Sequence, residues 1–300
     1  MKTALSSNAF LAKLLASPLF LRSDCFVGLI RDIAAGKPVR TPIATRADMP
    51  ADDEDQDEPC YPWEVPIFTV ENGVAVVEIS GALMKGLDPI TAWFYGCAST
   101  DRVQAALSEL AASDDVVAVV LKIDSPGGMV IGIPELGGQI AALAATKLVV
   151  AVTDLQACSA AYWLASQATF FYTTASAQVG SIGTYIALYD YSEYLAQMGV
   201  KLELFKRGKF KAIGVTGNPL DDDARAFLDE TVGRTNDQFL AAVRSKRANV
   251  ADSTMEGQWF DGAQAVDLGL ADKVVDSVSD VIAEVQSAVG ALLSAPINFG

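Results

Sequence analysis

The chain has 300 residues, of which 51% are hydrophobic and 20% are charged, so it can bury a sizeable core. Its net charge of −15 argues against nucleic acid or an anionic membrane surface as its main partner. The sequence contains no histidine, and its four cysteines form no C-x-x-C pair. We therefore expect no bound metal and no cofactor, and we interpret the cysteines as reduced thiols in a cytoplasmic protein.

The first 62 residues are predicted to lie outside the main domain. Residues 1–36 read as an N-terminal helical segment, and residues 37–62, which are rich in acidic residues, read as a disordered linker. The apolar run Phe10–Leu21 is broken by Lys13 and Pro18, so it is too short to span a bilayer. It also lacks a signal-peptide cleavage pattern, and we therefore expect a soluble, unexported protein without a membrane anchor.

Strands and helices alternate through the predicted main domain, residues 63–276, and a C-terminal helical tail, residues 277–300, follows it. Predicted strands cover residues 67–70, 74–79, 115–123, 148–152, 170–173, 185–188, 202–205 and 273–275. Predicted helices cover residues 100–112, 133–145, 160–168, 192–198, 220–247 and 260–270. Short connections between alternating elements predict an α/β fold with a largely parallel sheet.

Ser159 lies where an apolar strand region gives way to a predicted helix. A serine there has an exposed hydroxyl, and the helix amides behind it face the same space. The position suits a nucleophile, but a helix N-cap is the more common use of such a serine. Gly127 and Gly128 also follow a strand, so they and Ser159 can share one crevice at the carboxyl edge of the sheet. Their amides and that of Ala160 suit an oxyanion hole, or the glycines simply form a tight turn.

The absence of histidine excludes a Ser-His-Asp relay. A lysine is the usual substitute for the base, and it must act as the neutral amine, which requires burial or neighbouring groups that lower its pKa. Lys211 is the candidate, because it lies among small and apolar residues between Gly208 and Gly214. Lys209 and Lys206 remain rivals for this role.

Four motifs occur in one order and carry a family resemblance: Asp124–Gly128, Ala157–Tyr162, Gly180–Gly183 and Gly208–Lys211. Together they resemble the S49 peptidases, which comprise the signal peptide peptidase A group and phage head-maturation proteases of the minor capsid protein C type. The resemblance implies a ClpP/crotonase-like fold built from stacked ββα units. It places the peptidase domain at residues 63–276.

The same resemblance implies a role for each candidate site residue. Ser159 would be the nucleophile, Lys211 the general base, and Ser181 would orient the lysine amine. Gly127, Gly128 and Ala160 would supply the oxyanion hole. The chain has alanine at 160 and 161 where bacterial signal peptide peptidases commonly have glycine, and this form resembles the phage branch.

The expected function is that of a serine endopeptidase with a Ser-Lys dyad that processes phage or prophage capsid, scaffold or portal proteins. It would work in the host cytoplasm or inside the procapsid. Two alternatives remain: a signal-peptide-peptidase-like protease without a membrane anchor, and a crotonase-fold acyl-CoA enzyme. We also expect a homo-oligomer in which a neighbouring subunit supplies the lysine, because the long spacing between Ser159 and Lys211 does not force both into one chain's crevice.

Overall fold

The computed structural model describes Leu19–Leu21 and residues 65–294. The predicted linker, residues 37–62, and all of the predicted N-terminal helical segment, residues 1–36, except Leu19–Leu21 lie outside the described residues. The helical prediction is wrong for Leu19–Leu21, which form a short strand. Its main sheet has six strands, and all of their pairings are parallel except the one between β2 and β3. In spatial order the strands are β13 (Lys273–Val275), β10 (Phe170–Thr174), β8 (Leu148–Thr153), β6 (Ala118–Asp124), β3 (Val74–Ser80) and β2 (Phe68–Glu71). The predicted α/β fold with a largely parallel sheet is confirmed.

The one antiparallel pairing in the main sheet is a hairpin. Glu71 and Val74 pair across its turn, and Asn72 and Gly73 have positive φ angles of 52° and 77°. Asparagine and glycine tolerate this left-handed backbone, which is why Asn-Gly predicts a two-residue hairpin turn.

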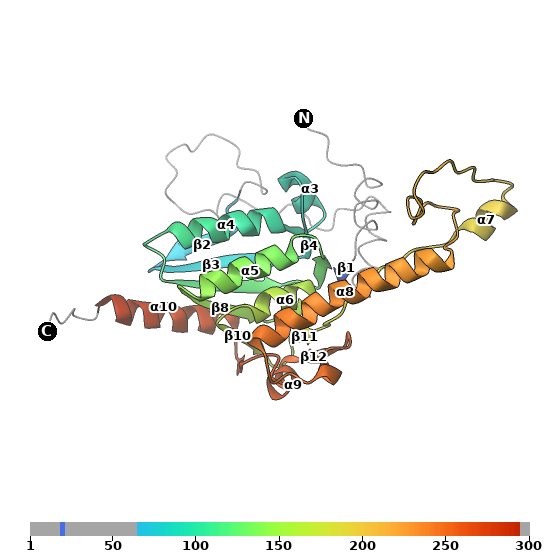
Figure 1. The fold of residues 1–300 in the computed structure, drawn as a ribbon. Helices are drawn as coiled ribbons and strands as arrows, with labels where there is room; N and C mark the ends of the chain where they lie inside the picture. Colours follow the sequence, from blue (N-terminus) through green and yellow to red (C-terminus); the bar gives the residue numbers. More distant parts are fainter. Residues whose placement is uncertain (1–18, 22–64, 295–300) are drawn as a thin grey trace, which may run out of the picture.

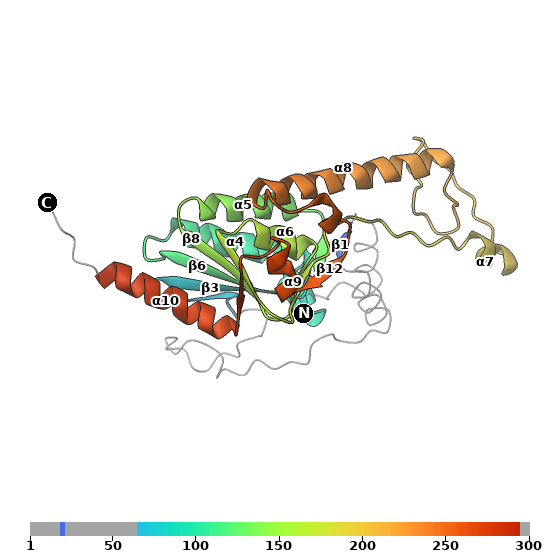
Figure 2. The ribbon, with the colours of Figure 1, turned by 90° about the horizontal axis from the view of Figure 1, so that it is seen from below.

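Helices cover both faces of the main sheet (Figures 1 and 2). On one face lie α4 (Thr100–Ala112), α5 (Ile133–Ala144) and α6 (Ala160–Ser166), and on the other lies α10 (Val278–Ser294). Side chains alternate along the strands, so Leu121 packs in the core under α5 whereas Val120 packs in the core under α10. A strand that is buried on both faces explains the continuous apolar run in β6.

Each of two central strands is followed by a short strand in a second layer and then by a helix. The units are β6, β7 (Gly127–Met129) and α5, and then β8, β9 (Gln156–Cys158) and α6. The short strands join two small sheets with the orders β1-β7-β4-β5 and β12-β11-β9. Their other members are β1 (Leu19–Leu21), β4 (Ala82–Met84), β5 (Cys97–Ser99), β12 (Trp259–Asp261) and β11 (Gln178–Gly180). The expected ββα units are therefore present.

The remaining helices are α3 (Pro89–Phe94), α7 (Ser192–Gln197), α8 (Asp222–Lys246), α9 (Gly262–Asp267) and the short 3-10 turn η2 (Asp252–Thr254). Asp221 caps α8, since its side chain accepts a hydrogen bond from the Ala224 amide at 2.7 Å. Asp222 and Asp223 in its first turn also suit the positive end of the helix dipole. None of the helices within residues 65–294 has both the length and the apolar composition that a bilayer crossing needs.

Residues 184–221 form an arm that extends away from the sheet, with α7 at its far end (Figure 1). The strands predicted at residues 185–188 and 202–205 are wrong, because neither segment forms one. Both have apolar and β-forming side chains, but the arm carries them away from the main sheet, which they would have to join. Their apolar side chains are therefore left partly exposed, and Phe205 is 91% exposed.

Close packing fixes the glycine at position 128. A Cβ atom there would lie 2.0 Å from the carbonyl oxygen of Leu83 in the neighbouring strand β4. We expect Gly128→Ala to destabilise the fold by about 3 kcal/mol, because the backbone of β4 would have to move. Gly138 is the matched control, since a Cβ atom on this exposed α5 residue meets nothing within 4 Å. Gly138→Ala should stabilise the helix by about 0.5–1 kcal/mol in a urea unfolding experiment, and equal effects of the two changes would contradict this account.

Candidate active site

Ser159 occupies a strained turn between β9 and α6. Its φ and ψ are 55° and −120°, a combination that is costly for a residue with a side chain. Its N–H donates to the carbonyl of Gly180 at 2.7 Å, and its own carbonyl accepts from the Trp163 amide at 2.9 Å. These two bonds hold the turn at both ends.

The side chain of Ser159 does not cap α6. It makes no capping hydrogen bond, and the backbone is outside the extended region in which N-cap residues lie. The N-cap alternative is therefore wrong for this serine. A strained backbone that gains nothing from capping is the kind of feature that occurs at functional sites.

Ser181 lies beside Ser159 because two short strands are in register. In the parallel pairing of β9 with β11, Cys158 lies opposite Gly180, so the residues that follow them are neighbours. Ser181 also has a positive φ, 53°, and its N–H donates to the carbonyl of Gln258 at 2.8 Å. Among the described residues, Asn72 in the hairpin is the one other non-glycine with a positive φ. Backbone strain is thus concentrated at these two serines.

The two serines line one cavity of about 550 Å³. Its other walls come from the start of the arm, from the middle of α8 and from the loop before β12; they are Ile182, Gly183, Thr184, Tyr185, Asp229, Val232, Gly233, Asn236, Met255, Glu256 and Gly257. Thr184 Oγ1 and Asn236 Oδ1 are buried and have no hydrogen-bond partner among the described residues. The cavity therefore offers unsatisfied polar atoms to a bound molecule.

The contribution of α8 to this cavity was not predicted. Asp229, Val232, Gly233 and Asn236 are spaced three, four and seven residues apart, so they share one face of the helix. This spacing was present in the sequence. The sequence did not tell which part of the molecule the face would contact.

The glycine turn, Ser125–Gly128, also lies close to Ser159. Ser125 donates its N–H to Gln156 at 2.9 Å and accepts from the Cys158 amide at 3.1 Å, directly before Ser159. Gly127 has a φ of 105°, which requires glycine, and its N–H donates to Ser125 Oγ at 3.2 Å. The amide of Ala160 lies in the first turn of α6, where backbone N–H groups lack partners within the helix.

The structure does not place Lys211 in this cavity. Lys211 lies exposed on the arm, and the described residues that line the cavity include no lysine or arginine. The neighbouring Phe210 stacks on Phe227 in the first part of α8, with ring centroids 4.8 Å apart. This contact holds the lysine segment near the beginning of α8. The first residue of α8 that lines the cavity is Asp229.

The two rival lysines have partners of their own. Lys209 forms an ion pair with Asp223 at 2.5 Å, and Lys206 donates to the carbonyl of Lys209 at 3.2 Å. Lys211 has no ion pair or side-chain hydrogen bond with the described residues. It is therefore the one lysine of this group whose amine is not engaged by the described part of the chain.

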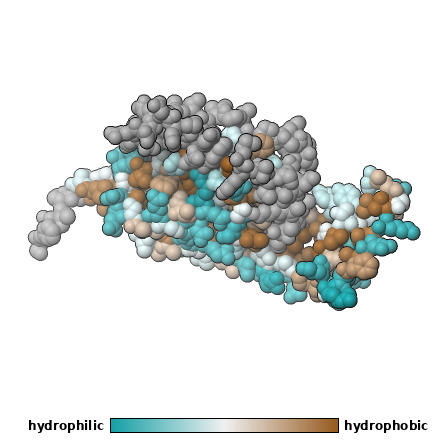
Figure 3. Space-filling model, turned by 90° about the horizontal axis from the view of Figure 1, so that it is seen from above, coloured by the Kyte–Doolittle hydropathy of each residue, from teal (hydrophilic) through white to brown (hydrophobic). Residues whose placement is uncertain are grey.

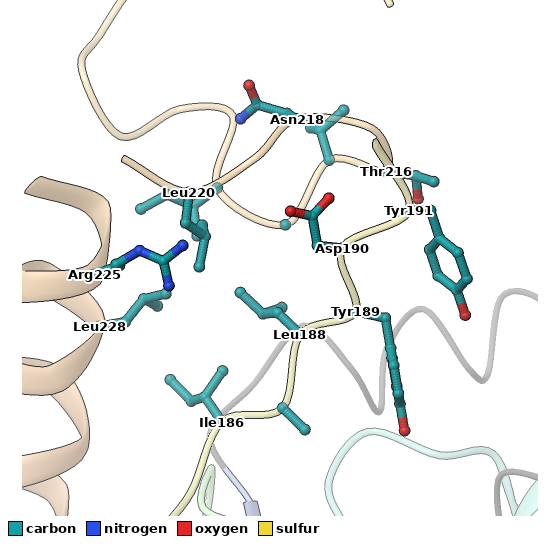
Figure 4. A pocket seen from close by; sticks show the side chains of 14 residues that line it. Ile186, Leu188, Tyr189, Asp190, Tyr191, Thr216, Asn218, Leu220, Arg225 and Leu228 are labelled. Carbon is teal, nitrogen blue, oxygen red and sulfur yellow. The ribbon is translucent and has the colours of Figure 1, made fainter. Parts of the chain in front are cut away.

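A second cavity, of about 560 Å³, lies at the base of the arm and does not include Ser159 (Figure 4). Leu188, Leu220 and Leu228 point into it, together with the polar groups of Asp190 and Arg225. Hydrogen bonds from Ser192, with a smaller contribution from the Arg225 charge, lower the pKa of Asp190. Many of the described residues that line this cavity are apolar, and none of them is a serine or a cysteine.

The chain matches the family model of peptidase family S49 over residues 141–291, which include both serines and Lys211. The chain belongs to peptidase family S49. Over residues 65–294, no group of three or more cysteine, aspartate or glutamate side chains is arranged to hold a metal ion.

This S49 chain is similar to two phage proteins. It is 32% identical to the capsid assembly protease C of Escherichia phage lambda, over 77% of this chain and 52% of that protein. It is 30% identical to the head-tail preconnector protein GP5 of Enterobacteria phage P21, over 74% of this chain and 44% of that protein. The chain spans about half the length of these curated relatives.

The solved structures that are similar to this S49 chain include an enoyl-CoA hydratase/isomerase from Marinobacter aquaeolei. The TM-score is 0.45 and the identity 13%, over 74% of this chain and 76% of that one.

Proposed function

We propose that this chain is a serine endopeptidase in which Ser159 is the nucleophile. The observation that carries the proposal is the strained, uncapped turn of Ser159 in a cavity with unsatisfied polar atoms. Ser159 Oγ would attack the scissile carbonyl and pass its proton to a base, and the amine of the leaving peptide would receive that proton. Family membership favours this reaction over acyl-CoA chemistry.

The amide of Ala160 and the glycine turn would bind the developing oxyanion. The Ala160 amide is suited to this role because it has no partner within α6. The Gly127 amide donates to Ser125 Oγ at 3.2 Å, so the hydroxyl of Ser125 would have to rotate away before this amide could contribute. Gly128 would contribute mainly by allowing the close approach of β4.

Lys211 from a neighbouring subunit would be the general base. None of the described residues that line the Ser159 cavity is a lysine or an arginine, so the base would have to come from outside this set. Insertion between two subunits would bury the amine, and burial favours its neutral form. Ser181, next to Ser159 in register, would then orient the amine with its hydroxyl.

The arm has the surface of an oligomerisation element. Exposed large apolar side chains gather between residues 188 and 227, and Figure 3 shows apolar residues on the part of the surface formed by the arm. Monomeric proteins rarely leave such an area uncovered. We therefore propose a homo-oligomer in which each arm docks on the next subunit and carries Lys211 to its cavity.

We propose phage head maturation as the biological role, with capsid, scaffold or portal proteins as substrates in the host cytoplasm or the procapsid. The names of the two phage relatives support it. A signal-peptide-peptidase role is the alternative, because the chain is also 26% identical to a putative signal peptide peptidase of Enterococcus faecium.

Incubation with the capsid and scaffold proteins of the same genome, followed by mass spectrometry, tests this role. We expect cuts at a few defined sites in the wild-type reaction and none with Ser159→Ala. Cleavage of signal peptides but of none of the head proteins would favour the alternative.

A further inference from the structure

The loop between α8 and β12 meets the candidate site at Ser181. Strands β11 and β12 pair antiparallel, and Gly180 lies opposite Trp259. At the next position the Ser181 N–H donates to the carbonyl of Gln258 at 2.8 Å. Ser181 has a φ of 53°, so this bond helps to hold a backbone conformation that is costly without support.

One peptide plane links this bond to Ser159. The carbonyl of the Gly180–Ser181 peptide accepts from the Ser159 N–H at 2.7 Å, while its N–H donates to Gln258. Because the peptide group is planar, a shift of the Gln258 carbonyl tilts the whole unit. Ser159 has a second anchor, since its own carbonyl accepts from the Trp163 amide at 2.9 Å. The tilt would therefore act mainly on Ser181.

The carbonyl of Gln258 also packs closely against this turn. A Cβ atom on Gly180 would lie 3.1 Å from the Gln258 carbonyl oxygen, and the φ of Gly180 is 113°. A glycine is therefore needed on the turn side of the contact. On the other side, the position of the carbonyl depends on how the loop before β12 is folded.

The side chain of Gln258 shapes that loop. Its Oε1 accepts from the Glu256 N–H at 2.8 Å, and its Nε2 donates to the carbonyl of Ser253 at 2.6 Å. These two bonds close the loop on itself directly before β12. The closed segment contains Met255, Glu256 and Gly257, which line the Ser159 cavity.

We infer that Gln258 is a positioning residue of the active site. Its side chain holds the loop, and its carbonyl then holds the Gly180–Ser181 peptide, so that Ser181 presents its hydroxyl beside Ser159. The inference rests on the proposed function, in which Ser181 orients the lysine amine. Gln258 is not among the described residues that line the cavity, so it acts through Ser181 and not on the substrate.

A double-mutant cycle separates this positioning role from general support of the fold. Gln258→Leu removes both side-chain bonds at similar volume, and Ser181→Ala removes the hydroxyl that Gln258 positions. We expect kcat to fall about 30-fold in Gln258→Leu and about 100-fold in Ser181→Ala. The double variant should also lose about 100-fold, because an absent hydroxyl cannot be misplaced. A loss of about 3,000-fold would overturn the inference, since independent effects multiply.

Gln264→Leu is the matched control. The side chain of Gln264 also accepts a backbone N–H, that of Asp261 at 3.3 Å, but it does so in the capping box of α9. Its loss should lower the stability of the fold and leave kcat nearly unchanged. Equal losses of kcat in Gln258→Leu and Gln264→Leu would also overturn the inference.

Failure of the inference can be told from failure of the proposed function. Hydrogen exchange at the Ser181 amide needs no turnover, and it should be faster in Gln258→Leu than in Gln264→Leu. The proposed function is read from labelling of wild-type Ser159 by a fluorophosphonate. Labelled Ser159 with equal exchange in the two variants leaves the peptidase proposal intact and rejects Gln258 as a positioning residue. Faster exchange in Gln258→Leu without labelling supports the positioning of Ser181 and rejects the nucleophile.

Discussion

Ser159→Ala is expected to lower kcat/KM for peptide hydrolysis by about 10⁴-fold or more, because loss of the nucleophile removes the whole covalent route. The fold should persist, since the Ser159 side chain makes no capping bond that alanine would lose. Kinetics on a fluorogenic peptide and a thermal melt measure the two effects together.

Ser166→Ala is the matched control for this change. Ser166 is buried in the same helix, and its hydroxyl donates to the Trp163 carbonyl at 2.7 Å, away from the cavity. Its loss should lower stability by about 1 kcal/mol and leave kcat/KM nearly unchanged. Substantial turnover by purified Ser159→Ala would remove the serine mechanism.

Lys211→Arg is expected to lower kcat by about 10³-fold, because a guanidinium group cannot act as a base at working pH. The substitution keeps the positive charge, so loss of activity would report the proton transfer and not the charge. Oligomer size, measured by light scattering, should remain that of the wild type.

Lys209→Arg makes the same chemical change two residues away and serves as the control. Lys209 is paired with Asp223, and an arginine can keep that exposed pair, which contributes little. We expect nearly wild-type kcat for this variant. The reverse pattern, an inactive Lys209→Arg and an active Lys211→Arg, would transfer the base role to Lys209.

The sequence predicted the central layer well because local pattern and tertiary contact agree there. β6 is a run of apolar β-formers, and it is buried on both faces as such a run requires. The helix start at Asp261 was predicted less well, although the signal was present. Asp261 and Gln264 form a capping box, so α9 begins at Gly262, and Trp259–Asp261 is a strand.

The short strands and the arm could not be predicted from local pattern. Gly127–Met129 has little intrinsic preference for a strand, and pairing with β1 and β4 is what makes it one. The prediction for residues 202–205 failed in the opposite way. Their side chains favour a strand, but no described strand pairs with them on the arm. In both cases the deciding interaction is distant in sequence.

In the candidate site, too, some residues could be predicted from the sequence and others could not. Ser159 is a candidate because of its position between strand and helix, and Ser181 is one because of the family resemblance of the Gly180–Gly183 motif. The α8 wall, including Asn236, was missed because it depends on how a long helix packs. The location of Lys211 depends on where the arm leads, which its spacing from Ser159 leaves open.

Complementation between two inactive chains tests most directly the claim that active sites are completed between subunits. Ser159→Ala and Lys211→Ala are unfolded, mixed in equal amounts and refolded, and the mixed oligomers are isolated by two affinity tags. Random assembly pairs an intact serine with a neighbour's intact lysine at about one quarter of the interfaces, so about one quarter of wild-type activity should return. If tagged mixed oligomers form and stay inactive, the lysine does not come from a neighbouring subunit and the proposed arrangement is contradicted.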